Sequence, residues 1–143
     1  MDVRLNRSWW LLRLGLGIGP IVAGIDKFFN FLTNWGMYLN PFAPRLLHIE
    51  PKTFMHLVGV VEIVVGVTVL TRYTRYAAYI VMIWLWAIAA NLISQWAFLD
   101  IAVRDIEISF GAFALATLSG VKTTTAHGEE TSHLSQEEVS IFS

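Results

Sequence analysis

Four apolar runs in a chain of only 143 residues constrain its fold more than any other feature. They cover residues 9–29, 54–70, 76–96 and 106–121. The first three are close to the ~20 residues that a helix needs to cross hydrocarbon. The fourth is shorter and follows Arg104 and Asp105 directly, so its charged start must lie at the headgroups. The sequence therefore predicts an all-α bundle of four transmembrane helices.

Composition supports a membrane protein. Hydrophobic residues make up 55% of the chain and charged residues 15%, whereas a soluble domain has about 25% charged residues. A water-soluble fold of this size has too much surface to cover with so few charges. The net charge of -1 gives no reason to expect a nucleic acid partner. The expected partners are the lipid bilayer and other membrane-protein subunits.

The segments between the runs differ in kind. Residues 30–53 form a long loop between the first two helices, with aromatic residues and three prolines, and we expect it to lie partly helical on the membrane surface. Only residues 71–75 separate the second and third runs, so these helices must be antiparallel neighbours. We divide the chain into a membrane domain, residues 1–121, and a polar tail, residues 122–143, for which composition predicts disorder.

The basic residues predict an orientation. Arg4 and Arg7 precede the first run as in a signal peptide, but Arg13 would interrupt its apolar core, so we expect an uncleaved helix. If the N-terminus is cytoplasmic, the basic residues on the cytoplasmic side are Arg4, Arg7, Arg72, Arg75 and Lys122. Those on the outer side are Lys27, Arg45, Lys52 and Arg104. The positive-inside rule favours this arrangement. The prediction is a multi-pass protein of a bacterial cytoplasmic (inner) membrane, with both termini in the cytoplasm.

Polar residues within the runs form the candidate site. A charge inside a span costs ~2.5–3.5 kcal/mol on insertion scales, so it needs a partner or a wet cavity. The polar residues are Arg13, Asp26, Lys27, His56, Glu62, Asn91, Gln95, Arg104, Asp105 and Glu107. At a rise of ~1.5 Å per residue, Glu62 falls near mid-membrane. All except Arg13 gather in the outer half of the predicted bundle, below the 30–53 loop.

Small residues share faces with the charged ones. Glu62 lies on a stripe with Gly59 and Gly66, and Arg13 on one with Gly17 and Gly24. Such faces allow helices to approach closely, so these charges should point inward. A separate pair, Gly15-x-x-x-Gly19, is a helix-contact motif for use within the bundle or with a partner.

Two interpretations of the polar cluster stay open. Its charges could form structural ion pairs, such as Arg13–Glu62 or Lys27–Glu107. Alternatively, the outer half could hold a ligand cavity walled by polar side chains and by Trp84, Trp86 and Trp96. No metal or haem is predicted, because His56 has no second histidine at its depth. No catalytic motif is present, and the absence of cysteine excludes thiol chemistry within this chain.

The chain resembles the DoxX-like family of small four-helix membrane proteins over most of residues 9–121. The resemblance is carried by Leu11-Leu12-Arg13-Leu14-Gly15, Ala23-Gly24-Ile25-Asp26-Lys27-Phe28, Gly59-Val60-Val61-Glu62-Ile63, Thr71-Arg72 and Arg104-Asp105-Ile106. It implies the fold and the membrane location. Some members of the family are membrane subunits of oxidoreductases, notably a thiosulfate:quinone oxidoreductase, and many have no assigned activity.

Two functional hypotheses follow from the residues and the resemblance. The favoured one is an accessory or anchoring subunit, not catalytic on its own, of a larger membrane complex of the electron-transport type. The alternative is a membrane subunit of a quinone-linked oxidoreductase that binds a quinone or another lipid-soluble ligand in the outer half. In that case Glu62 or His56 would exchange a proton with the head group, and Arg13 or Arg104 would stabilise its negative charge.

Overall fold

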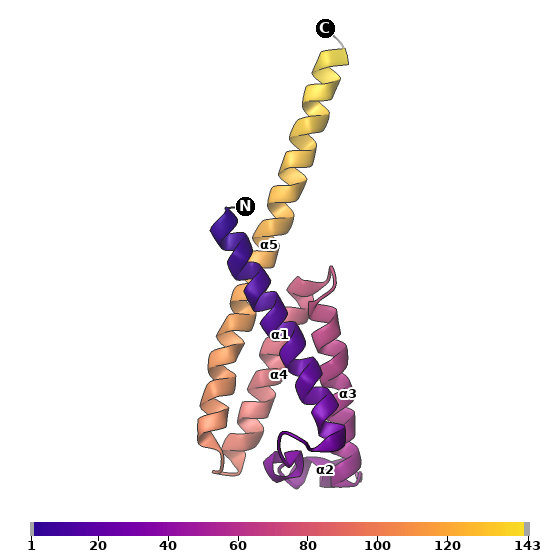
Figure 1. The fold of residues 1–143 in the computed structure, drawn as a ribbon, viewed down its shortest axis with the longest axis vertical. Coiled ribbons are helices and arrows are strands. Elements are labelled where there is room, and N and C mark those ends of the chain that lie inside the picture. The colour runs from indigo at the N-terminus through magenta and orange to yellow at the C-terminus, as the bar shows by residue number, and fades with distance from the viewer. Residues whose placement is uncertain (1, 142–143) are drawn as a thin grey trace.

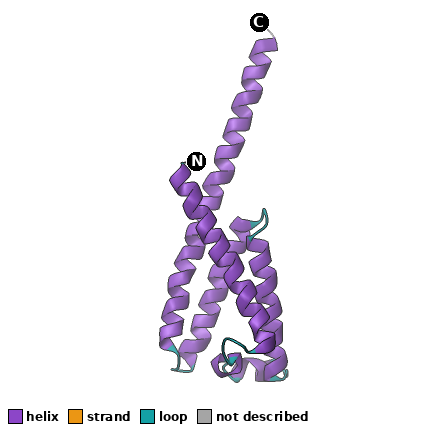
Figure 2. Ribbon diagram, in the orientation of Figure 1, coloured by secondary structure: helices purple, strands orange, loops and turns teal. Residues whose placement is uncertain are grey.

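The computed structural model describes residues 2–141, and the regular structure within them is entirely helical (Figures 1 and 2). In chain order the elements are α1 (Val3–Phe29), the 3₁₀ helix η1 (Trp35–Tyr38), α2 (Phe42–Leu46), α3 (Pro51–Val69), α4 (Thr74–Ser94) and α5 (Leu99–Ile141). The all-α prediction is confirmed. Three helices, α1, α3 and α4, are long and apolar enough to cross a membrane.

The apolar helices begin and end where local chemistry favours it. The side chain of Asp2 accepts a hydrogen bond from the Arg4 backbone N–H at the start of α1. At its end Asn30 adopts the left-handed conformation, with φ of 52°, and its N–H bonds the Asp26 carbonyl. Pro51 opens α3, where its missing N–H would have no intrahelical partner. α3 and α4 are joined by the short turn around residues 70–73, so they are antiparallel as predicted.

α1 packs on α3 through glycines, and this is the tightest contact in the bundle. A Cβ placed on Gly24 would lie 2.5 Å from the Gly59 carbonyl oxygen, and one on Gly66 would lie 2.5 Å from the Gly17 carbonyl oxygen. No side chain fits at such a separation, so the two backbones touch directly. The predicted inward face of Glu62, with Gly59 and Gly66, is confirmed.

α4 packs mainly along α5, and the buried apolar residues fall into two clusters. The first joins all four long helices near the start of α4, and it contains Trp9, Leu16, Val69, Ala77, Ala78, Val81, Ala112, Leu115 and Ala116. The second lies near the end of α4 and contains Ala89, Leu92 and Ala102. Small alanines at these positions let α4 and α5 approach closely. Between the two clusters lies a layer of buried polar side chains.

The two ends of the bundle carry different structures (Figure 1). At the loop end, residues 30–50 form η1, α2 and their connections between α1 and α3. At the turn end lie the start of α1 and the α3–α4 turn, and α5 extends past both of them (Figure 1).

The last helix differs from the sequence-based expectation at both of its ends. The apolar run of the sequence begins at Ile106, whereas α5 begins at Leu99. Arg104 and Asp105 lower the local hydropathy, but they do not interrupt the backbone hydrogen bonds of the helix. For residues 122–143 composition favours disorder, whereas α5 continues to Ile141. Adding turns to an existing helix costs less than nucleating one. Residues 142–143 lie outside the described residues.

Candidate functional site

The candidate site is built on an ion pair between α1 and α3. Lys27 Nζ lies 2.6 Å from Glu62 Oε2, and the two side chains are only 5% and 7% exposed. Side chains lean towards the N-terminus of their own helix. Because α1 and α3 are antiparallel, Lys27 and Glu62 lean towards each other. This is the only salt bridge among the described residues.

A tryptophan of η1 closes the ion pair from the loop end. Lys27 Nζ lies 3.7 Å from the centre of the Trp35 ring, within the range of a cation–π contact. The indole N–H of Trp35 donates to Asp26 Oδ2 at 2.7 Å. The Asp26 carboxylate also accepts from the backbone N–H groups of Phe31 and Leu32. Asp26 therefore folds the chain back after α1 and holds Trp35 over Lys27.

Two further polar groups reach the ion pair from the other helices. Asp105 of α5 is buried and lies within electrostatic range of both Lys27 and Glu62. Trp84 of α4 lies near the Glu62 carboxylate, but its buried indole N–H has no hydrogen-bond partner among the described residues. We call Lys27, Glu62, Trp84 and Asp105 the polar centre. Each of the four long helices contributes one residue to it.

Asn91 and Gln95 fasten the loop instead of joining the polar centre. Asn91 Nδ2 donates to the Tyr38 carbonyl at 2.8 Å, and Gln95 Nε2 donates to the same oxygen at 2.9 Å. The Asn40 backbone N–H donates to Asn91 Oδ1. Because Asn91 and Gln95 are four residues apart, both side chains lie on one face of α4, where they bind the backbone of residues 38–40.

Arg13 lies at the turn end, far from the other predicted site residues. Its guanidinium donates to the carbonyls of Val69, Leu70 and Thr71, at 3.2, 2.5 and 2.8 Å. It thereby satisfies carbonyl groups at the C-terminal end of α3 and in the turn that follows, where the helix offers no further N–H partners. The expected pairing Arg13–Glu62 is wrong, because Glu62 binds Lys27 and Arg13 caps α3.

The remaining predicted residues line the loop end without entering the polar centre. His56 is half-buried and stacks on Phe28, with ring centres 4.9 Å apart. Arg104 and Glu107 are exposed, so the expected pairing of Lys27 with Glu107 is also wrong. On a helix, Asp105 and Glu107 point about 200° apart, and only Asp105 faces inward. Trp86 and Trp96 are exposed, and neither lines the two hollows described below.

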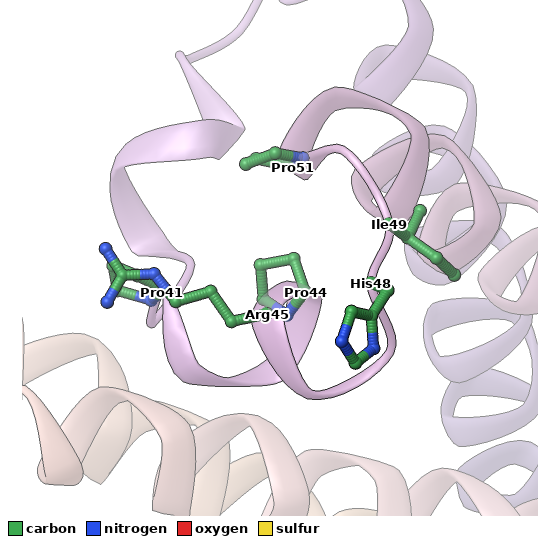
Figure 3. A pocket seen from close by; sticks show the side chains of 6 residues that line it. All are labelled: Pro41, Pro44, Arg45, His48, Ile49 and Pro51. Atoms are coloured by element: carbon green, nitrogen blue, oxygen red, sulfur yellow. The ribbon is translucent and has the colours of Figure 1, made fainter.

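Two surface hollows lie at the loop end. One of about 470 Å³ is lined by Pro41, Pro44, Arg45, His48, Ile49 and Pro51 (Figure 3). The other, of about 500 Å³, is lined by Val22, Ile25, Asp26, Phe29, Phe31 and Leu32. Neither hollow could be predicted from the sequence, because both depend on how residues 30–50 fold. Among the described residues, no group of histidine and carboxylate side chains could hold a metal ion.

The fold and the buried polar layer define a small helical integral membrane protein. The family model for DoxX matches residues 8–95, more than half of the chain, and the protein belongs to that family. The matched region contains α1 from residue 8 onward, α3, α4 and the Lys27–Glu62 pair. Comparisons with curated proteins and with solved structures found no match.

Proposed function

We propose that this protein is a non-catalytic accessory subunit that anchors or seals a larger membrane complex. The observation that carries the proposal is the outward face of α1. A Cβ placed on Gly15 or Gly19 would meet no other atom within 4 Å. The Gly15-x-x-x-Gly19 motif is therefore not used inside the bundle, where Gly17 and Gly24 make the contact with α3.

The outward face of α1 that contains Gly15 and Gly19 is suited to a transmembrane helix of another subunit. Leu11, Ile18 and Val22 around it are 73%, 49% and 48% exposed. In lipid, apolar side chains gain little by leaving the acyl chains, so helix association depends on close backbone approach at small residues. An exposed glycine face of this kind favours a protein partner over lipid alone.

The polar residues support a structural role. Lys27 and Glu62 neutralise each other, Asp26 holds the start of the loop, and Asn91 and Gln95 hold its middle. None of these contacts places a nucleophile beside a general base. The electron-transport character of the proposed complex rests on the family resemblance alone.

Purification in mild detergent tests the subunit proposal. A tagged chain should bring with it one or more membrane proteins at a fixed ratio. The double variant Gly15→Leu/Gly19→Leu should lose them while keeping the melting temperature of the chain. The control Ala87→Leu/Ala90→Leu places the same two leucines on an exposed face of α4 and should keep them. Loss of the partner in the α4 variant alone would place the contact elsewhere, and the proposal would fail.

We also propose that α5 crosses the membrane as a fourth span, with both termini in the cytoplasm. The support is its packing along α4 and the arginines of the turn end. Reporters fused before Arg4 and after Val121 should both report the cytoplasm, and one inserted at Asn40 should report the outside. A C-terminal reporter on the outside would contradict either the fourth span or the orientation.

A second candidate is a lipid-soluble ligand such as a quinone at the loop end. It is favoured by two residues of the polar centre. The N–H of Trp84 has no hydrogen-bond partner among the described residues and could donate to a quinone carbonyl, and Asp105 could accept from a quinol hydroxyl. A quinone would supply reversible uptake of two electrons and two protons. Lipid extracts of the purified protein should then contain stoichiometric quinone, and Trp84→Phe should lower that content without changing the melting temperature. Quinone-free protein with intact partners would exclude this candidate.

A further inference from the structure

Charge is distributed unequally between the two ends of the bundle. Up to residue 125, the turn end carries six basic residues, Arg4, Arg7, Arg13, Arg72, Arg75 and Lys122, against a single acidic one, Asp2. The loop end carries four basic and six acidic residues. Within residues 2–125 the turn end is therefore strongly positive, and the loop end is slightly negative. The four remaining acidic residues, Glu129, Glu130, Glu137 and Glu138, come later in the sequence of α5.

Within residues 2–125 the positive charges of the turn end have no carboxylate partner, because the only salt bridge in that range is Lys27–Glu62 of the polar centre. Arg13 binds backbone carbonyls, Arg72 donates to the Tyr73 hydroxyl, and Lys122 donates to Asn6 Oδ1. Arg4, Arg7 and Arg75 are exposed. All these partners are neutral, so no hydrogen-bond partner within residues 2–125 cancels the charge of these three cations.

Packing brings cations from different helices to one level. The Arg75 guanidinium of α4 lies against α5 at Gly120, with Cζ 3.3 Å from the position that a Cβ would take. Two residues further on, Lys122 Nζ lies 3.8 Å from the centre of the Trp9 ring of α1. Trp9 in turn donates to Ser119 Oγ at 2.7 Å. Gly120 thus leaves room for a cation beside the one that Trp9 holds.

Aromatic residues at the same level indicate which kind of partner these cations face. Trp10, Tyr73 and Tyr76 are 44%, 51% and 68% exposed at the turn end. Amphipathic rings of this kind settle at the boundary between headgroups and acyl chains. The exposed surface of α1 directly beyond them is apolar, with Leu11 and Leu14. A ring of cations above such a boundary lies at the depth of lipid phosphates.

We propose that the turn end is a binding surface for anionic phospholipids, centred on Arg72, Arg75 and Lys122. The lipid phosphate lies among these side chains, with its acyl chains along the exposed apolar faces below. The arginine guanidinium groups offer paired N–H donors that match phosphate oxygens. This inference does not depend on the accessory-subunit proposal or on which side of the membrane the turn end faces.

The test measures lipid selectivity of the full chain. Native mass spectrometry of protein from micelles of equal phosphatidylglycerol and phosphatidylcholine should show phosphatidylglycerol retained preferentially. Each basic residue near an anionic surface contributes about a fivefold preference, so Arg72→Gln/Arg75→Gln should lower it about thirty-fold. The matched control Arg45→Gln/Lys52→Gln removes two exposed cations from the loop end and should leave the preference within about twofold of wild type.

Three results would overturn the proposal. They are equal retention of the two lipids by wild type, no change in the turn-end variant, and an equal loss in the loop-end control. Arg13 is left intact in every variant because it caps α3, and an unchanged melting temperature in phosphatidylcholine verifies the fold. If a variant does unfold, raising the salt concentration on wild-type protein replaces it, since exposed charge interactions weaken as the screening length falls. A salt-independent preference would then refute the electrostatic site.

Discussion

Replacing Glu62 with glutamine should destabilise the bundle, and the size of the effect follows from the geometry of the polar centre. The change removes one charge from a contact of 2.6 Å between side chains that are 5% and 7% exposed. Stranding one member of a buried pair costs about 3–5 kcal/mol. Lys27 keeps the Trp35 ring and the nearby Asp105 as partial substitutes. We therefore expect the lower end, about 3 kcal/mol.

The reverse change should cost more. Lys27→Met removes the cation that pairs with Glu62 and leaves two buried carboxylates, Glu62 and Asp105, close to each other. Arg104 still acts on Asp105, but Lys27 is the only salt-bridge partner of Glu62 among the described residues. We expect about 4–5 kcal/mol, the upper end for a broken buried pair. The double variant Lys27→Met/Glu62→Gln removes both members of the pair, so neither charge is left without the other. Its loss of stability should therefore be smaller than the sum of the two single losses by about 2 kcal/mol or more. Glu107→Gln, the same chemistry on an exposed residue, should stay within about 0.5 kcal/mol of wild type.

Unfolding in mixed micelles by increasing sodium dodecyl sulfate measures these differences, with far-ultraviolet circular dichroism as the signal. Three outcomes would refute the reasoning. If Glu62→Gln and Glu107→Gln were equally stable, the buried pair would contribute nothing to the fold. If Glu62→Gln were more damaging than Lys27→Met, Asp105 would not share the charge of Lys27. Additivity of the two single changes would also exclude a direct interaction between them.

Three other predictions concern packing, the loop and thiol reagents. Gly24→Ala should cost about 1–3 kcal/mol, because its Cβ meets the Gly59 carbonyl, whereas Gly19→Ala should be neutral or slightly stabilising. Thermal unfolding of the two variants compares their stabilities, and equal effects would contradict the packing of α1 on α3. Trp35→Phe removes the hydrogen bond to Asp26 and should speed limited proteolysis within residues 30–50; an unchanged cleavage rate would mean that the bond does not hold the loop. Alkylating reagents should leave any activity of the isolated chain unchanged, since it has no cysteine, and sensitivity would assign the activity to a partner.

The sequence predicts the helices well and their pairings poorly. Hydropathy locates α1, α3 and α4 to within a few residues, apart from the polar start of α1, because burial in lipid depends on composition along the chain. The inward direction of Glu62 also follows from its spacing to Gly59 and Gly66. Its partner does not, because a partner depends on how far two helices are shifted along each other, and periodicity on a single helix contains no such information.

Arg13 and the glycines of α1 show the same limit. The sequence places Arg13 on one face with Gly17 and Gly24, and that face does pack against α3. The guanidinium of Arg13, however, donates to carbonyl groups at the end of α3. The familiar Gly15-x-x-x-Gly19 spacing draws attention first, yet the glycines that contact α3 are seven residues apart. A motif identifies a face on which helices can meet; it does not say which helix meets it there.

The seven-residue spacing on both helices has a consequence for how α1 finds its position. Gly17 and Gly24 meet Gly66 and Gly59, so sliding α1 by seven residues, about 10 Å, would still leave one glycine pair in contact. Glycine packing alone therefore accepts more than one register. The same slide would separate Lys27 from Glu62 and leave both charges in hydrocarbon. The ion pair selects one register among those that the backbones allow.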